Sequence, residues 1–215
     1  MSLSAKLTEK RQASKDGLPK DIHATMMNAT KELSETNIVA NAPKVGEKLL
    51  TFKLPNASGT TSNLQELLKT GPVVLTFYRG GWCPYCNLEL QAYQAVLNDI
   101  NAAGVTLIAV TPELPDESLS TSQKNKLAFE VLTDKNSEYA RELGLVFTLP
   151  EKLRPIYSSF GIDVEKHNGK GQFDFPLAAT FVVGTDGIII DAFVDADYTQ
   201  RKEPSEIVKV LNNIS

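Results

Sequence analysis

The chain has 215 residues and a net charge of −4, from 22 Lys and Arg against 26 Asp and Glu. This acidic balance argues against binding to nucleic acid or to an anionic membrane, because both attract basic surfaces. The polar start lacks the apolar core of a secretory signal, and no run approaches the roughly 20 apolar residues of a membrane span. We therefore expect a cytoplasmic protein with one domain and an appendage.

Residues 1 to 42 are predicted to form an N-terminal helical arm, since a few apolar residues recur at loose helical spacing within a polar segment. Pro43 and Gly46 then break any helix, so the compact domain is predicted to span residues 43 to 215. The apolar residues of the arm form one apolar stripe along its surface. This stripe indicates packing on its own domain or a contact with a second copy in a homodimer.

The first part of the domain contains the start of a sheet. Residues 49 to 54 suggest a short strand, and residues 62 to 71 a short helix with Ser62 at its N-cap. The apolar and β-branched run PVVLTFY, residues 72 to 78, predicts a central strand that is buried on both faces.

A helix over residues 86 to 104 follows this strand, with Pro84 in its first turn, and residues 105 to 111 form a second buried strand. Together these segments predict a strand, helix, strand crossover and hence a parallel pair. Helical and short apolar segments then lead to strands at residues 178 to 183 and 187 to 194. The turn Gly184-Thr185-Asp186-Gly187 joins them as a hairpin.

A closing helix is predicted over residues 204 to 214. The order β, α, β, α, β, β, α, with a Cys-x-x-Cys pair after the first core strand, predicts an α/β, thioredoxin-like fold. In this fold a central mixed sheet is flanked by helices, and here the N-terminal helical arm extends it.

Cys83 and Cys86 are the only cysteines, and they are expected at the start of the long helix. Unpaired N–H groups and the positive end of the helix dipole stabilise a thiolate there. The spacing brings the two sulfurs close enough for a disulfide, so we expect Cys83 to react and Cys86 to resolve the product. In a reducing compartment such a pair is better explained by redox cycling than by a structural staple.

Two other interpretations of the pair stay open. The cysteines could simply fill the core, or they could be half of a zinc site that dimerisation completes. Against the zinc site, His23 and His167 are single, distant in sequence and predicted to lie on the surface. No metal is expected, because zinc usually needs four N or S ligands. No cofactor is expected, because the glycines before Cys83 form no phosphate-binding motif.

The segment GPVVLTFYRGGWCPYCNLELQAYQ resembles the peroxiredoxin-like branch of the alkyl hydroperoxide reductase and thiol-specific antioxidant (AhpC/TSA) family, within the thioredoxin superfamily. The resemblance continues through VTPELPDESLSTSQKN, LGLVFTLPEKLR and FPLAATFVVGTDGIIIDAFVDADYTQRKEP, and so covers roughly residues 43 to 211. It implies a thioredoxin fold and thiol-based reduction of a peroxide or disulfide substrate. A thioredoxin- or glutathione-type reductant would then restore the thiols.

The resemblance leaves the attacking cysteine open. Read as a thioredoxin-like Trp-Cys-x-x-Cys site, the segment makes Cys83 the nucleophile. Aligned with typical peroxiredoxins on Phe77-Tyr78, it places Arg79 at the family's proline, Cys83 at the hydroxyl residue that contacts peroxide, and Cys86 at the peroxidatic cysteine.

Four further residues are predicted to support the cysteines. Arg79 would sit over the thiolate and lower its pKa. Trp82 would cover the disulfide and offer a docking surface for a partner. Tyr85 would tune the exposure of the two cysteines to solvent, and Thr180 would face the site from a neighbouring strand.

Ala178 departs from both templates, which have a cis-proline or an arginine at this position. A cis bond before a residue other than proline costs about 2.5 to 4 kcal/mol, so we expect a trans bond and a looser substrate platform. Pro176 is interpreted as a surface-loop proline. The departure keeps two alternatives to a peroxidase open: a protein thiol-disulfide oxidoreductase, and a redox sensor or binding module without enzymatic activity.

Overall fold

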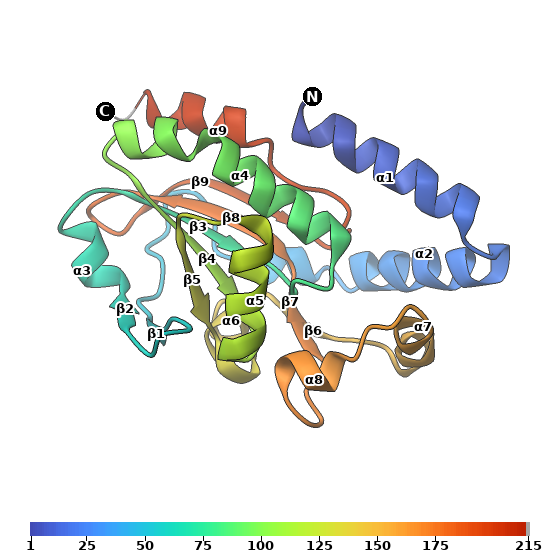
Figure 1. The fold of residues 1–215 in the computed structure, drawn as a ribbon. Helices are drawn as coiled ribbons and strands as arrows, with labels where there is room; N and C mark the ends of the chain where they lie inside the picture. Colours follow the sequence, from blue (N-terminus) through green and yellow to red (C-terminus); the bar gives the residue numbers. More distant parts are fainter. Residues whose placement is uncertain (214–215) are drawn as a thin grey trace.

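The structure is a computed structural model, and it describes residues 1–213. A five-stranded sheet with strand order β5-β4-β3-β8-β9 lies at its centre (Figure 1). The strand β3 pairs in parallel with β4 and antiparallel with β8. The sheet is therefore mixed, which confirms the predicted fold class. Its strands are β3 (Val73–Phe77), β4 (Thr106–Thr111), β5 (Glu130–Thr133), β8 (Ala178–Val183) and β9 (Ile189–Asp195).

The helix α4 (Pro84–Ala102) connects β3 to β4, as the crossover pattern predicted. It starts at Pro84, whose missing N–H costs nothing in a first helical turn. The strand β5 extends the parallel part of the sheet by one strand. The hairpin between β8 and β9 closes through a hydrogen bond from Gly187 N–H to the Gly184 carbonyl, 2.8 Å, and this turn was predicted.

Both faces of the sheet are covered. On one face α4 and α9 (Pro204–Leu211) bury apolar side chains such as Leu90 and Ile207. The opposite face is covered by α3 (Leu64–Leu68) and α6 (Glu138–Glu142), through Leu64 and Tyr139. Because β3 lies between these two cores, all five of its residues are buried.

The remaining elements lie outside the five-stranded sheet. They are β1 (Lys53–Pro55), β2 (Thr61–Asn63), α5 (Pro115–Asn125), β6 (Val146–Thr148), α7 (Arg154–Ser159), α8 (Val164–Asn168), β7 (Asp174–Pro176) and the 3-10 turns η1 (Ile38–Asn41), η2 (Lys135–Ser137) and η3 (Glu151–Leu153). None of the described helices is both long and apolar enough to cross a membrane.

Several predicted boundaries differ from those observed. The first strand is shorter than expected and begins at Lys53. The N-cap of α3 is Asn63 instead of Ser62, since the Asn63 side chain accepts a hydrogen bond from the Gln65 N–H. Pro176 is buried in β7, so its interpretation as a surface-loop proline was wrong. The helix α9 ends at Leu211, and the last residue predicted for it, Ile214, lies outside the described residues.

The arm consists of α1 (Leu3–Gly17) and α2 (Lys20–Glu35), and both pack on the chain's own domain. Leu3 and Leu7 of α1 are each 2% exposed and belong to the core beneath α4 and α9. The Glu203 carboxylate accepts from the Leu3 and Ser4 N–H groups, at 3.1 and 2.9 Å, and so satisfies the free donors of the helix start. Figure 1 shows α1 beside α4 and α2 turning back from it.

Candidate active site

The two cysteines lie where α4 begins, immediately after the loop that leaves β3. Cys83 is the N-cap, and its Sγ accepts the backbone N–H of Cys86 at 3.4 Å. The position of Cys83 at the helix start and of Cys86 in the first turn agrees with the sequence prediction. Both side chains are fully buried and both thiols are free.

Arg79 contacts the first sulfur. Its Nη2 lies 3.3 Å from Cys83 Sγ, and its Nη1 donates to the Tyr157 hydroxyl at 3.1 Å. The guanidinium carbon lies 4.0 Å from the centroid of the Tyr198 ring, so cation–π attraction also holds it. Arg79 is only 4% exposed, and it is a residue of the site instead of a solvated loop arginine.

Arg201 contacts the second sulfur, and sequence reasoning missed it. Its Nη2 lies 3.3 Å from Cys86 Sγ, across 115 residues of sequence, and its Nε donates to Glu89 Oε2 at 2.6 Å. Glu89 is one helical turn after Cys86, and both members of this ion pair are 1% exposed. Arg201 thus brings an arginine to the site, although the chain has Ala178 at the position where the resemblance implied one. The missing arginine at position 178 was the one sign in the sequence that an arginine from another segment could take its place.

The charges around the sulfurs favour one thiolate. Two buried guanidinium groups face one buried carboxylate, that of Glu89, so a single negative sulfur completes the balance. Burial alone would raise the pKa of Cys83. The hydrogen bond from Cys86 and the charges of Arg79 and Arg201 outweigh burial and hold this pKa well below its usual value.

The second thiol is shifted in the opposite direction. Burial raises the pKa of Cys86 well above its usual value, and the hydrogen bond to Cys83 together with the negative charge of that sulfur adds to the rise. Arg201 alone would favour a thiolate on Cys86, but its effect is smaller than that of burial. These opposite shifts favour a thiolate at Cys83 and a thiol at Cys86.

Trp82 packs against two aromatic rings under the loop. Its ring centroid lies 5.6 Å from that of Tyr157 and 5.2 Å from that of Phe175. Its Nε1 is buried and has no hydrogen-bond partner among the described residues. Trp82 thus adjoins Cys83 and fixes the turn, while its predicted role as a docking surface stays a prediction.

Tyr85 and Thr180 occupy different environments. The hydroxyl of Tyr85 lies 3.4 Å from Ser14 Oγ, which ties the start of α4 to the arm. The Thr180 hydroxyl lies 3.0 Å from Thr76 Oγ1 and 3.1 Å from the Tyr93 hydroxyl. Thr180 therefore lies between β3 and α4, and neither of these two hydrogen bonds is made to a sulfur atom. The peptide bond before Ala178 is trans, as predicted.

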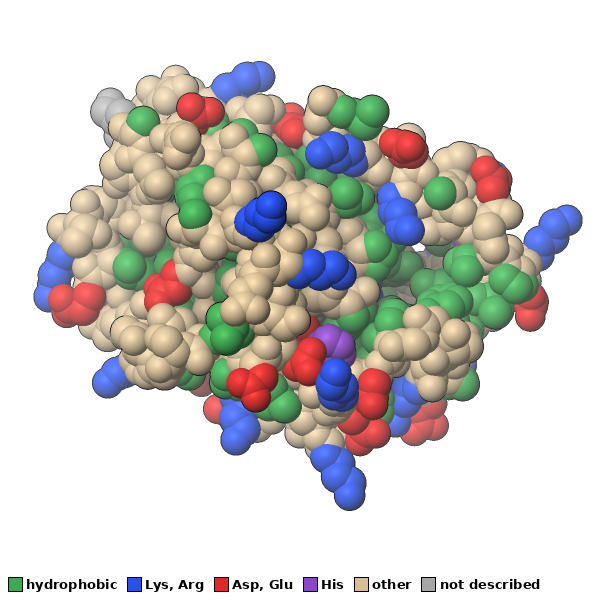
Figure 2. Space-filling view, in the orientation of Figure 1, with side chains coloured by type: hydrophobic (Ala, Val, Ile, Leu, Met, Phe, Trp, Pro, Cys, Tyr) green, Lys and Arg blue, Asp and Glu red, His purple; other side chains and the backbone are tan. Residues whose placement is uncertain are grey.

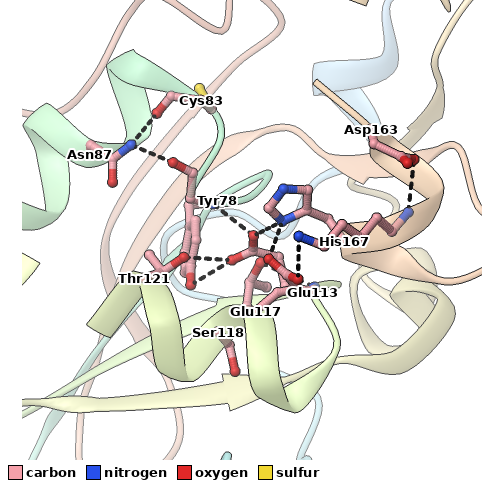
Figure 3. A network of polar contacts seen from close by, with 12 residues as sticks. Tyr78, Cys83, Asn87, Glu113, Glu117, Ser118, Thr121, Asp163 and His167 are labelled. Atoms are coloured by element: carbon pink, nitrogen blue, oxygen red, sulfur yellow. Dashed lines mark hydrogen bonds and ion pairs between the residues drawn. The ribbon is translucent and has the colours of Figure 1, made fainter. Parts of the chain in front are cut away.

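A buried carboxylate holds the loop before Cys83, and Figure 3 shows the network that it forms. Glu113 Oε1 accepts from the Gly81 N–H at 2.9 Å and lies 2.9 Å from His167 Nδ1. Its Oε2 accepts from the Thr121 hydroxyl at 3.2 Å and from the Tyr78 hydroxyl at 3.4 Å. The prediction that His167 lies on the surface was wrong, because its side chain is 20% exposed and paired with a buried acid.

The same loop is held from its other side by Asn87 of α4. The Asn87 amide donates to the carbonyls of Gly81 and Cys83, at 2.7 and 3.0 Å, and accepts from Asn125 Nδ2 at 2.7 Å. Side chains thus bind both the N–H and the carbonyl of Gly81. A Cβ at Gly81 would lie 1.9 Å from Thr121 Oγ1, so only glycine fits. The loop that carries the thiolate is fixed before any reaction.

Comparisons with known proteins agree on one family. A model of the AhpC/TSA family matches residues 45–192. The chloroplastic peroxiredoxin Q of Populus jackii is 24% identical over 144 residues, which cover 65% of this chain and 67% of that protein. Peroxiredoxin Bcp of Escherichia coli is 23% identical over 105 residues, or 49% of this chain and 67% of that protein.

Solved structures share the fold. Peroxidoxin BcpB from Mycobacterium tuberculosis has a TM-score of 0.62 at 20% identity, and the match covers 80% of this chain and 98% of that one. A variant of peroxiredoxin 6 from Arenicola marina has a TM-score of 0.65 at 19% identity, covering 80% and 74%. Residues 1–44, which include α1 and α2, precede the segment that the family model matches.

Proposed function

Because the chain belongs to the AhpC/TSA family and is a thiol-dependent peroxidase, we propose that Cys83 and Cys86 reduce peroxides through a dithiol–disulfide cycle. Cys83 is the attacking sulfur in this proposal and Cys86 the resolving one. The observation that carries it is the pair of buried arginines, one at 3.3 Å from each sulfur, with a single carboxylate to balance them.

The first step oxidises Cys83. Its thiolate attacks the terminal oxygen of the peroxide, the O–O bond breaks, and a sulfenic acid forms on Cys83 while the other oxygen takes up a proton and leaves as alcohol or water. Arg79, at 3.3 Å from the sulfur, stabilises the thiolate and the negative charge that develops on the oxygens.

The second step closes the disulfide. The Cys86 thiol gives up its proton and attacks the Cys83 sulfur, the S–O bond breaks, and the released hydroxide takes that proton and leaves as water. The guanidinium of Arg201 beside Cys86 favours the loss of this proton. Since the Cys86 N–H already contacts Cys83 Sγ, bond formation needs little movement of α4.

An external thiol system must then reduce the disulfide. A related structure, that of a yeast mitochondrial 1-Cys peroxiredoxin, has a title that describes thiol resolution through glutathione and thioredoxin systems. By analogy we assign this chain a thioredoxin- or glutathione-type reductant. A cytoplasmic location stays a prediction from the sequence. A homodimer also stays a prediction, which light scattering on the whole chain would test.

The proposal is tested by stopped-flow fluorescence of the reduced protein mixed with hydrogen peroxide. Trp82 is the only tryptophan and adjoins Cys83, so its emission reports oxidation. The wild type should show two phases, the Cys86→Ser variant only the first, and the Cys83→Ser variant neither. A fast first phase in Cys83→Ser that is lost in Cys86→Ser would exchange the two roles. Slow oxidation by peroxide but prompt oxidation by a protein disulfide would favour the oxidoreductase alternative.

A further inference from the structure

The loop between β9 and α9, residues 196–203, holds the side chain of its own Arg201. In this β9–α9 loop the Nη1 of Arg201 donates to the backbone carbonyls of Tyr198 and Gln200. Its Nη2 lies 3.3 Å from Cys86 Sγ. Because the guanidinium is a rigid plane, the two carbonyls determine where its other nitrogens point. The contact between Arg201 and Cys86 therefore depends on the shape of the loop.

The helix α1 of the arm binds the β9–α9 loop on both sides of Arg201. Two residues before Arg201, the Thr199 carbonyl accepts a hydrogen bond from Arg11 Nη1 at 3.2 Å. Two residues after it, the Glu203 carboxylate accepts from the free N–H groups at the start of α1. Thr199 lies between the two residues whose carbonyls bind Arg201. Arg11 thus holds the part of the loop that sets the direction of the guanidinium.

The domain does not fill the space beside this part of the loop. A cavity of about 550 Å³ opens between the arm and the domain, and its lining includes Tyr198, Thr199 and Arg11. Figure 2 shows a hollow between α1 and α2, with hydrophobic side chains around it. Among the described residues, the backbone of Thr199 hydrogen-bonds only to Arg11 and to Asp197 of the same loop. Close packing normally fixes a buried segment, and here a hydrogen bond from the arm takes that role.

Apolar packing directs Arg11 to the loop. Leu3 and Leu7 of α1 belong to the core cluster that contains Cys83 and Cys86. Arg11 follows Leu7 by four residues, so both side chains lie on the same face of the helix. Both α1 and the β9–α9 loop lie outside the segment that the family model matches. The contact between them is therefore a feature of this chain that the family match does not describe.

We propose that α1 is a positioning element of the reaction: Arg11 and Glu203 hold the β9–α9 loop so that its guanidinium stays beside Cys86. The inference rests on the proposed function, in which Cys86 resolves the sulfenic acid of Cys83. In that step the Cys86 proton leaves with the released hydroxide as water, and an S–S bond replaces the S–O bond. The arm acts on this second step through Arg201, and the first step does not need it.

The test removes one attachment of the arm and follows the two steps separately. Arg11→Met deletes the donor to Thr199 and keeps most of the side-chain length. Stopped-flow Trp82 fluorescence of the reduced protein with hydrogen peroxide resolves a first phase, whose rate rises with peroxide concentration, and a second phase, whose rate does not. The second phase should slow about threefold to tenfold, as the loss of one hydrogen bond predicts. The first should stay nearly unchanged, because Arg79 still contacts Cys83.

Further variants provide a rescue, a second attachment and a control. Arg11→Lys keeps a donor and should restore most of the second rate. Glu203→Ala removes the carboxylate that binds the start of α1 and should also slow the second phase, whereas Glu203→Gln keeps an acceptor oxygen and should slow it less. Lys31→Met removes a cation of α2 whose side chain is 75% exposed, and it should leave both phases unchanged.

A double variant shows whether the arm acts through Arg201. Arg201→Lys keeps a cation for Glu89 but loses the fork that binds the loop carbonyls and Cys86 together. It should slow the second phase. Adding Arg11→Met should then slow it little further, because changes at residues that act through one another are not additive.

Mass spectrometry gives a readout that a loss of stability alone does not change. A sulfenic acid that waits longer for Cys86 reacts with a second peroxide molecule, which transfers an oxygen to form a sulfinic acid and leaves as water. At equal peroxide concentration the sulfinic fraction of Cys83 should therefore rise in Arg11→Met and fall back in Arg11→Lys. This fraction depends on the ratio of two rates and not on the amount of folded protein.

The outcomes separate this inference from the function on which it rests. An unchanged second phase in both Arg11→Met and Glu203→Ala would overturn the inference and leave the proposed cycle intact. Equal slowing of both phases, or additive effects of Arg11→Met and Arg201→Lys, would also overturn it, because the arm would then not act through Arg201. A wild type without a second phase, or a second phase that persists in Cys86→Ser, would overturn the inference and the proposed cycle together.

Discussion

Replacing Arg79 by methionine keeps much of the side-chain volume at the site but removes the charge beside the Cys83 sulfur. The contact is 3.3 Å, and at an effective dielectric constant of about 20 a full pair of charges at that distance interacts by about 5 kcal/mol. The net loss is smaller, because the buried guanidinium no longer has to be desolvated and Arg201 remains close. A charge-assisted hydrogen bond contributes about 1.5 to 3 kcal/mol, so we take about 2 kcal/mol.

The sign of the effect follows from the lowered pKa of Cys83. Thiolate is present above that pKa, and losing Arg79 moves the pKa upward, so the thiolate forms only at higher pH. A loss of about 2 kcal/mol corresponds to about a thirtyfold smaller ratio of thiolate to thiol at a pH between the two values. Because the thiolate is the nucleophile, peroxide oxidation should slow by up to the same factor.

The measurement is the rate of alkylation by iodoacetamide as a function of pH, with the modified cysteine identified by mass spectrometry. The inflection should move to higher pH in Arg79→Met and return most of the way in Arg79→Lys, which restores a charge. Arg141→Met removes an arginine that is 54% exposed and paired with Asp174, and it should leave the profile unchanged. An unmoved or lowered inflection in Arg79→Met would refute the assignment of the thiolate to this contact.

Three further predictions concern stability. Leu7→Ala should lower the free energy of unfolding by about 2 to 5 kcal/mol in urea, because Leu7 is 2% exposed, and a negligible loss would mean that α1 does not dock on its own domain. Gly81→Ala should cost about 1 to 3 kcal/mol, since its Cβ would meet Thr121, and unchanged thermal unfolding would contradict that close approach. Burial raises the pKa of Glu89 to about 7, against the attraction of Arg201, so the folded state keeps a proton that the unfolded state has lost between pH 4.5 and 7. The unfolding free energy should therefore fall as pH rises through this window, and Glu89→Gln should remove that part of the pH dependence, which denaturant titrations at several pH values would show.

The parts of the site that were predicted correctly are determined by residues close to one another in the sequence. The buried strand before Cys83, Pro84 in the first turn and the three-residue spacing to Cys86 together define a helix start with two thiols on it. N-cap geometry and helical spacing are local properties, so one segment of sequence suffices. The same reasoning placed Arg79 near the sulfur, four residues before Cys83.

The residues that reasoning missed reach the site through long-range packing. Arg201 lies 115 residues from Cys86, and Glu113 lies 32 residues from Gly81. No periodicity marks them, since each stands in a loop after a strand, and only the pairing order of the sheet brings those strand ends together. His167 was taken for a surface residue for the same reason, because its acidic partner Glu113 is 54 residues away. The arm is similar: its helices could be predicted, but the cavity that they form with the domain could not.

The two arginines explain how this site accommodates a cysteine at the position where the family alignment expects a hydroxyl residue. A hydroxyl can only donate to a neighbouring thiolate, whereas a thiol can also ionise and compete for the negative charge. Here Arg79 contacts Cys83, while Arg201 shares its charge between Cys86 and Glu89.

Above the Glu89 pKa of about 7 its carboxylate is ionised and neutralises Arg201, so the second sulfur then feels less net positive charge than the first. Once Cys83 is oxidised to a sulfenic acid its negative charge is gone, and so is one of the causes that raised the pKa of Cys86. Arg201 then favours ionisation of the resolving thiol at the moment when a second nucleophile is needed. In the proposed cycle Arg79 thus serves the first step and Arg201 the second.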